Sequence, residues 1–151
     1  MAENKKIWPA RLHHFALTSE QPGELADWYV RAMGYDKKSL GDGYILSGAE
    51  RNLLILLGRK SQVAFSSYAV ADQRQLVEVS KAMEVSGYEV QKFKTPFFSD
   101  DTVSVTDFDG NVFAFGMLCD GMSGKDELPG RLQHIVFTTT QLTKQVSFFT
   151  D

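Results

Sequence analysis

The sequence predicts an α+β protein built from repeated units in which a strand and a helix are followed by further strands. Two observations predict this fold class. The spacing of apolar residues changes from the strand period of two to the helical period of about 3.6 and back, twice in the same order. The opening of this pattern then returns a third time near the C-terminus. With 151 residues and 43% apolar side chains, the chain can bury the core of one ordinary domain.

The first unit is expected between residues 11 and 58. A short apolar run at residues 12–18 predicts its first strand. An apolar stripe at helical spacing follows, made by Leu25, Trp28, Tyr29, Ala32 and Met33. Pro22 suits the first turn of this helix and Gly34 its C-terminal end. Residues 44–47 and 53–57 predict two further strands, and the short connection between them predicts a hairpin.

The second unit is expected between residues 62 and 118, and it repeats the same order. Asp72, with Gln75 three residues later, predicts a capping box at the start of a helix that Gly87 ends. Asp109-Gly110 is a strong signal for the turn of a hairpin. The strands predicted around these features lie at residues 63–70, 88–93, 102–107 and 112–117.

The C-terminal part of the chain restates its beginning. After a segment at 119–130 with the composition of a linker, Arg131–Thr138 repeats the pattern of Arg11–Thr18. The match continues without a gap, so that Phe148 and Phe149 fall on Trp28 and Tyr29 and the same helix is expected. A lone strand and half a helix cannot bury their apolar faces. We therefore expect a fragment of a longer protein, the alternative being partner strands supplied by another molecule.

These motifs resemble the glyoxalase/bleomycin resistance/dioxygenase (vicinal oxygen chelate) superfamily. The resemblance rests on the Arg-Leu-x-His opening strand, on the aromatic pair Trp28-Tyr29 before Gly34, and on the turn Asp107-Phe-Asp-Gly-Asn111. It implies tandem βαβββ modules that pair into a half-open barrel, the glyoxalase/extradiol dioxygenase-like fold. The resulting organisation has a tail at 1–10, an N-terminal domain at 11–118 with modules at 11–58 and 62–118, a linker at 119–130, and the start of a truncated C-terminal domain at 131–151.

In single-domain metalloenzymes of this superfamily, four strand positions hold the metal. Here the first position is His14, whereas the others fall within Leu53–Leu57, at Gln62 or Val63, and at Ala114. One imidazole without further N, O or S ligands does not make a divalent-metal site. His14 is therefore interpreted as a vestigial, hydrogen-bonded histidine, and His13 is expected on the opposite face of the strand, at the surface or in an interface.

Such a loss of ligands resembles the N-terminal part of a type I extradiol dioxygenase of the 2,3-dihydroxybiphenyl 1,2-dioxygenase-like kind. In that architecture only the C-terminal barrel keeps iron, and the resemblance places its first ligand at His134. A second histidine and a glutamate would lie beyond Asp151 and complete a facial triad. The full-length protein is thus expected to use Fe(II), alternatively Mn(II), to open a catechol or biphenyl-diol ring with O2. The fragment itself is expected to be inactive and to hold no cofactor.

Two alternatives stay open. One is a non-catalytic binding module of the bleomycin-resistance type, in which aromatic side chains line a groove for a flat ligand. The aromatic residues considered for such a groove are Trp28, Tyr29, Phe65, Phe113 and Phe115. The other is a 4-hydroxyphenylpyruvate-dioxygenase-like enzyme, which also keeps its iron in the C-terminal half.

Composition narrows the partners. A net charge of −3 without a basic stripe argues against nucleic acid and against an anionic membrane surface. The longest apolar run, Leu53–Leu57, is too short to span a bilayer, and no apolar segment follows the first lysines as a secretory signal would require. The single cysteine, Cys119, suits a reducing compartment. A cytoplasmic homo-oligomer acting on a small aromatic molecule and O2 is therefore expected.

Overall fold

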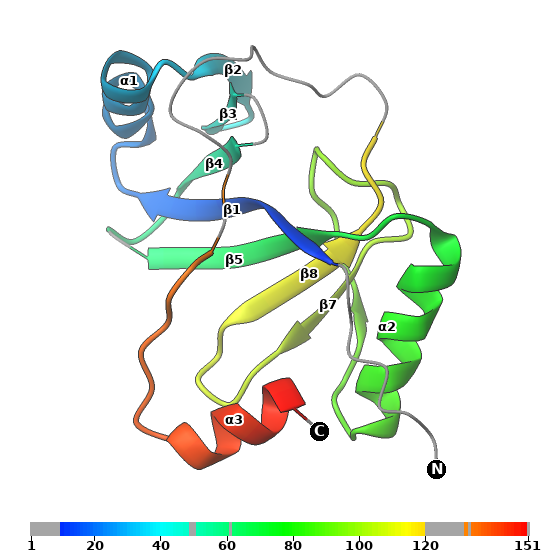
Figure 1. Ribbon diagram of the computed structural model, residues 1–151. Helices are drawn as coiled ribbons and strands as arrows, with labels where there is room; N and C mark the ends of the chain where they lie inside the picture. The colour runs from blue at the N-terminus through cyan, green and yellow to red at the C-terminus, as the bar shows by residue number, and fades with distance from the viewer. Residues whose placement is uncertain (1–9, 49–50, 61, 120–131, 133, 151) are drawn as a thin grey trace. The chain divides into compact units, whose positions relative to one another are not determined.

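The computed structural model describes residues 10–48, 51–60, 62–119, 132 and 134–150. In this part of the chain we find eight strands and three helices (Figure 1). In chain order they are β1 (Arg11–Ser19), α1 (Pro22–Met33), β2 (Asp36–Leu40), β3 (Gly43–Gly48), β4 (Arg51–Leu57), β5 (Gln62–Ala69), α2 (Gln73–Val85), β6 (Gln91–Lys92), β7 (Val103–Thr106), β8 (Val112–Gly116) and α3 (Leu142–Thr150).

The order strand, helix, strand, strand, strand occurs twice, so the predicted α+β class and the βαβββ modules are confirmed. The described residues divide into two compact units. The first unit contains residues 12–67 together with 132 and 134, and the second contains residues 10–11, 68–119 and 135–150. The predicted tail and linker lie outside the described residues, apart from residues 10 and 119.

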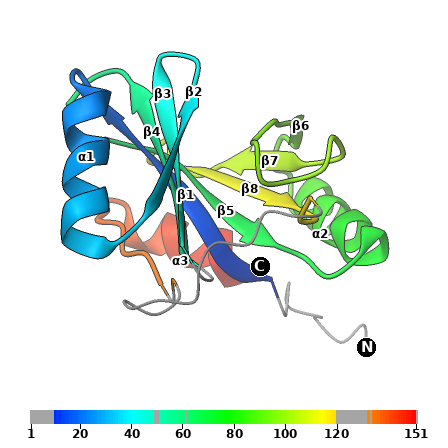
Figure 2. The same cartoon turned by 90° about the horizontal axis from the view of Figure 1, so that it is seen from above.

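In the first unit the strand order is β2-β3-β4-β1-β5. The strands β2, β3 and β4 form an antiparallel meander, whereas β1 runs parallel to β4 with His14 opposite Asn52. A parallel pair requires a crossover, and α1 begins the crossover that connects β1 to β4. This helix packs on β3 and β4 (Figure 2). Its Ala26 is fully buried there, in a core that also contains Tyr35, Leu46, Leu53 and Ile55.

Both ends of α1 follow the sequence prediction. Pro22 occupies the first turn, where its missing N–H costs no hydrogen bond. Gly34 ends the helix with a φ of 66°, in the left-handed region that glycine adopts without steric strain, and its N–H donates to the Val30 carbonyl at 3.0 Å. The start and the end of this helix are thus fixed by local chemistry.

The strand β2 was not predicted from the sequence. Its residues, Asp-Lys-Lys-Ser-Leu, show no apolar alternation, and the first four of them are exposed. This strand is the edge of the first unit's order and pairs only with β3. Charged side chains are typical of an edge strand, where they prevent pairing with other chains. The strand therefore exists because β3 offers a hydrogen-bonding edge, which the local pattern of residues does not reveal.

In the second unit the strand order is β8-β7-β6, and the end of β5 lies on the other side of β8. There the N–H of Val70 donates to the Gly116 carbonyl at 3.0 Å. The predicted capping box at the start of α2 is confirmed. The N–H of Gln75 donates to Asp72 Oδ1 at 2.8 Å, and the Gln75 side chain accepts from the N–H of Ala71 at 3.0 Å. The core of this unit contains Val70, Leu76, Val79, Met83, Val105, Phe113 and Phe115.

The third copy of the repeat forms its helix but not its strand. Of the residues predicted as a strand at 131–138, the structure describes 132 and 134–138, and none of them belongs to a strand. Burial nevertheless alternates along them: Ile135 and Phe137 are partly buried, whereas His134 and Val136 are exposed. The apolar pattern of a strand is present, but within the described residues no neighbouring strand pairs with it. α3 follows at the place that the repeat predicts.

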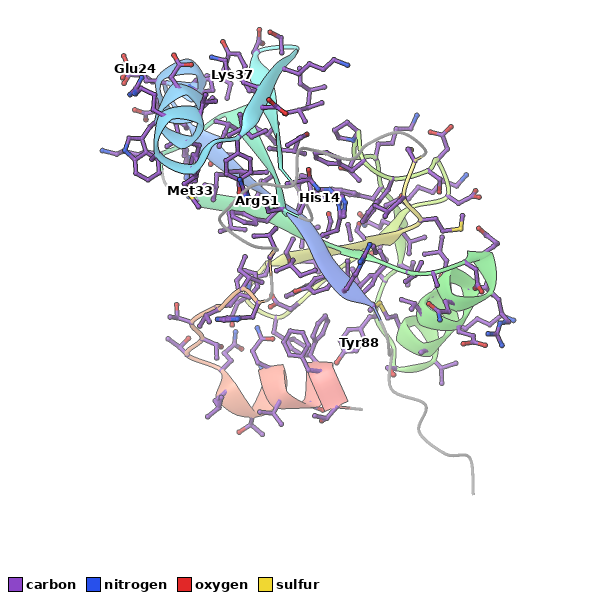
Figure 3. The ribbon with its side chains drawn as sticks, turned by 45° about the horizontal axis from the view of Figure 1, so that its top comes forward. His14, Glu24, Met33, Lys37, Arg51 and Tyr88 are labelled. Atoms are coloured by element: carbon purple, nitrogen blue, oxygen red, sulfur yellow. The ribbon has the colours of Figure 1, made fainter. Side chains whose placement is uncertain are left out.

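Arg51 is a buried charge that the sequence analysis placed in the connection between two strands. In the structure it is the first residue of β4 (Figure 3), and its side chain is only 1% exposed. Its Nη2 donates to the carbonyl of Met33, at the C-terminal end of α1, at 3.0 Å. Its guanidinium lies 5.2 Å from the centroid of the Tyr35 ring. Arg51 therefore binds a carbonyl that the helix itself leaves without a partner.

Gly48 is required opposite this arginine. The two residues are paired in the β3–β4 register. A Cβ atom at position 48 would lie 2.7 Å from Arg51 Nε and 2.8 Å from its Cγ, which is closer than such contacts allow. The absence of a side chain at position 48 thus makes the space in which the buried guanidinium lies.

We expect Arg51→Ala to lower the free energy of unfolding by about 2–4 kcal/mol, because it leaves a cavity and a buried carbonyl without its donor. The matched control is Lys37→Ala. Lys37 also lies over a tyrosine ring, that of Tyr44, and pairs with Asp27, but this pair is partly exposed. Urea denaturation of both variants measures the difference. Equal losses would show that burial does not set the contribution of Arg51.

Candidate functional site

The candidate site in the first unit is a pair of buried histidines on β1. His14 is fully buried and His13 is 7% exposed. Their Nδ1 atoms lie 2.9 Å apart, and the side-chain amide nitrogen of Asn52 lies 3.2 Å from His13 Nε2. The parallel register of β1 and β4 brings Asn52 to this place, since it sets Asn52 opposite His14. The two imidazoles and the amide form one hydrogen-bonded chain.

The hydrogen bonds define where the protons lie. The amide of Asn52 donates to His13 Nε2, so that nitrogen is an acceptor without a proton. His13 then carries its proton on Nδ1 and donates it to Nδ1 of His14. In neutral His14 the remaining proton is on Nε2. In this arrangement both rings are neutral, and the lone pair of His14 Nδ1 is used by His13.

Burial keeps His14 uncharged. The pKa of His14 is lowered from its usual 6.5 to about 2, first because burial removes the imidazolium from water and then because a charge on His13 would repel it. The Phe65 ring lies nearly perpendicular to the His14 ring, with 6.0 Å between the ring centroids. A neutral imidazole is therefore the stable form throughout the physiological range of pH.

Buried polar side chains also lie on β5, the strand next to β1, but the described residues do not form a metal site. Ser66 and Ser67 on β5 are fully buried, and within the described residues neither hydroxyl has a hydrogen-bond partner. Gln62 and Val63, where the resemblance predicted a ligand position, are exposed. Across the described residues, no group of three or more His, Cys, Asp and Glu side chains is placed to hold a metal ion. The residues around His14 thus do not fit an iron site.

The position expected for His13 was wrong. Because alternate residues of a strand point to opposite faces, we expected His13 at the surface or in an interface, away from His14. The structure buries it and turns its ring toward His14, with 5.1 Å between the ring centroids. The sequence contained no signal for the decisive partner, Asn52, because that residue is 39 positions away along the chain.

His134 lies in a different environment. It is exposed and belongs to no strand. Its place in the repeat is the place of His14, but Gln133 precedes it in the sequence, whereas His13 precedes His14. The metal ligands predicted to accompany it lie beyond Asp151.

The aromatic residues considered for a ligand groove occupy two kinds of position. Phe65, Phe113 and Phe115 are buried, each less than a tenth exposed. The Tyr68 ring stacks on Phe113 and Phe115, with centroids 6.3 and 5.6 Å away. Trp28 is 51% exposed on the outer side of α1. Phe65, Phe113 and Phe115 are therefore core residues, whereas Trp28 is a surface residue.

Comparisons with known proteins give matches to solved structures. No protein-family model matches the chain, and no curated protein matches it. A variant of homoprotocatechuate 2,3-dioxygenase from Brevibacterium fuscum is similar to it, with 15% identity and a TM-score of 0.63 over 72% of this chain and 32% of that one. The native enzyme from Arthrobacter globiformis has 18% identity and a TM-score of 0.63 over 72% and 36% of the two chains. This chain has an extradiol dioxygenase-like fold.

The resemblance to the vicinal oxygen chelate superfamily is therefore confirmed at the level of the fold. The match lies in the N-terminal part of the dioxygenases. The chain spans about a third of the length of these enzymes. No helix in the described part of the chain is long and apolar enough to cross a membrane.

The buried His14 should make stability depend on pH. Its pKa is 6.5 in the unfolded chain and about 2 in the folded one, so between these values only the unfolded chain binds the proton. Above pH 6.5 His14 is neutral in both states and does not change the free energy of unfolding. Below that pH the free energy of unfolding falls by up to about 1.4 kcal/mol for each pH unit, because protonation stabilises the unfolded chain. Urea denaturation between pH 7 and pH 5 should give a steeper pH dependence for the wild-type chain than for His14→Gln. Identical slopes would contradict a buried, neutral His14.

Proposed function

We propose that this chain is the N-terminal, non-catalytic portion of an extradiol ring-cleaving dioxygenase that acts on a catechol or a biphenyl-diol with O2. The observation that carries the proposal is the likeness of the fold to the homoprotocatechuate 2,3-dioxygenases, over about a third of their length. One of these similar structures, from Brevibacterium fuscum, is a complex with HPCA. The hydrogen-bonded state of His14 supports a structural role for the part of the chain that the match covers.

The metal ligand in this proposal is His134. It holds the histidine position of the second Arg-Leu-x-His sequence, which opens the third repeat, and its side chain is exposed. The second histidine and the glutamate of a facial triad would follow beyond Asp151. Fe(II), or alternatively Mn(II), would act there as a Lewis acid that lowers the pKa of the hydroxyls of a catechol. It would also hold the catechol and O2 side by side. The first two modules would support and orient the C-terminal barrel.

The proposal includes the partners and the setting of the enzyme. The substrate is a small aromatic diol, and nucleic acid and membrane have no part in its activity. A cytoplasmic location agrees with a single cysteine in 151 residues. The working form is a homo-oligomer, which light scattering of the longer protein would measure.

The two alternative functions make different demands on the chain. A binding module of the bleomycin-resistance type would need aromatic side chains open to a ligand, but Phe65, Phe113 and Phe115 are held in the core. A 4-hydroxyphenylpyruvate-dioxygenase-like enzyme would share the C-terminal iron and differ in its substrate. Activity with each substrate class on the longer protein separates this enzyme from a catechol dioxygenase.

The test uses the reading frame that contains this chain. We expect about 130–150 further residues, enough for one more pair of modules, with a strand-borne histidine and a late glutamate. The protein expressed from this frame should bind iron and turn catechol or 2,3-dihydroxybiphenyl into a yellow ring-opened product. His134→Ala should abolish both iron binding and product formation, whereas the matched change His14→Ala should leave the iron content unchanged.

Three results would contradict the proposal. A stop codon shortly after residue 151 would leave no C-terminal barrel. A longer protein without iron and without product would favour a binding role. Equal iron content in His134→Ala and in the wild type would show that this histidine is not a ligand, even if the protein cleaves aromatic rings.

A further inference from the structure

The tip of the β7–β8 hairpin is a rigid turn that presents one carboxylate. Asp107 Oδ1 accepts the N–H groups of Asp109 and Asn111 at 2.9 and 2.8 Å, and Asn111 Nδ2 donates to Asp107 Oδ2 at 2.8 Å. Gly110 completes the turn with a φ of 83°. These bonds use the carboxylate of Asp107 inside the turn. The carboxylate of Asp109 takes no part in holding the turn and is directed to other partners.

Those partners come from the C-terminal segment. Gln145 Nε2 donates to Asp109 Oδ2 at 2.6 Å, and Gln141 Nε2 donates to Asp109 Oδ1 at 3.2 Å. The same Gln141 nitrogen lies 3.3 Å from the Phe108 carbonyl. Hydrogen bonds from Thr139 and then from Gln145 lower the pKa of Asp109, with smaller contributions from Gln141 and Lys144. The carboxylate is thus an acceptor shared by several residues of one segment.

Apolar contacts surround the polar ones. The ring of Phe148 on α3 lies 4.7 Å from the Tyr88 ring and 5.7 Å from the Phe113 ring, measured between centroids. Phe137, before the helix, lies 5.5 Å from Phe113. Lys144 Nζ lies 5.8 Å from the centroid of Phe108 at the tip of the hairpin. Hydrogen bonds to a charged group and an aromatic cluster therefore hold α3 on the same surface of the second unit.

The aromatic residue on the outer side of α1 has a counterpart in α3 that makes contacts. By the repeat, Phe148 corresponds to Trp28, and Val146 corresponds to Ala26. In α1, Trp28 is 51% exposed and Ala26 is buried under the strands of its own module. In α3 the relation is reversed, since Phe148 is partly buried and Val146 is 51% exposed. Gln145 and Phe149, which also contact the second unit, correspond to Leu25 and Tyr29, which pack on the core beneath α1, so the contact with the hairpin also uses part of the face that covers a module's own strands.

We propose that the tip of the β7–β8 hairpin is a docking site for the helix of the third repeat, and that Asp109 is the residue that fixes the helix there. The contact is an intramolecular latch between consecutive repeats, made by Asp109 with Gln141 and Gln145 and by the Phe148 cluster. It goes beyond the proposed activity and does not depend on it, because each of these residues lies in the present chain.

The experiment exchanges the donor and the acceptor of the shortest contact. Gln145→Glu sets a second carboxylate against Asp109 Oδ2, and Asp109→Asn replaces one acceptor oxygen with a donor. The double variant Asp109→Asn/Gln145→Glu restores a donor–acceptor pair in the opposite direction. Asp101→Asn is the matched control, because it removes an exposed carboxylate from the same unit, outside the latch. Hydrogen exchange of peptides from α3, β8 and β4 is measured by mass spectrometry.

We expect exchange in α3 to become at least about tenfold faster in each single variant, as the loss of a charge-assisted hydrogen bond implies. The double variant should exchange more slowly than Gln145→Glu, and Asp101→Asn should resemble the wild type. Exchange in β8 and β4 should stay unchanged. Equal α3 exchange in Asp109→Asn and Asp101→Asn would overturn the latch. A double variant in which α3 exchanges no more slowly than in Gln145→Glu would also overturn the latch. An equal rise of exchange in β8 would do so too, because it would show that Asp109 supports the hairpin itself.

Discussion

The parallel pairing of β1 with β4 determines most of the chemistry of the first unit. Parallel neighbours cannot be joined by a tight turn, so the chain between them must cross over, and α1 is the helix of that crossover. The pairing also sets Asn52 opposite His14. Because both β1 histidines are then buried, each ring needs hydrogen-bond partners within the protein. The chain of bonds from Asn52 through His13 to His14 meets that requirement.

The same requirement separates a structural histidine from a metal ligand. A ligand needs a ring lone pair that can be directed at the metal, and second-shell partners usually occupy the N–H of the other nitrogen. In His14 the roles are reversed, since Nδ1 accepts from His13 and the remaining proton is on Nε2. The histidine of the Arg-Leu-x-His motif on β1 is thus part of the packing here. The Arg-Leu-x-His pattern therefore indicates a place in the fold and leaves the chemistry of the histidine to its neighbours.

The sequence predicted those features that local chemistry determines. Pro22 and Gly34 at the ends of α1, the capping box at Asp72 and the turn at Asp109-Gly110 all occur as expected, since each depends on residues within a few positions of one another. The features that it missed depend on distant partners. The strand β2 forms because β3 offers an edge, and Arg51 is buried because α1 ends beside it with an open carbonyl. The partner of His13 lies on another strand.

In the third repeat a strand that the local pattern predicts does not form in the described residues, because its partner is missing there. The same repeat also shows how duplicated modules can be joined. Its residues have the pattern of β1, but a strand needs a neighbour, and the described residues offer none to 134–138. A helix satisfies its own backbone hydrogen bonds, so α3 forms where the strand does not.

A helix also has more than one face. In α1 one face covers the strands of its module and the aromatic residue on the other, Trp28, remains half exposed. An outer aromatic residue that stays half exposed in the first copy can thus become, in the third copy, the contact that binds one module to another, as Phe148 does against Tyr88.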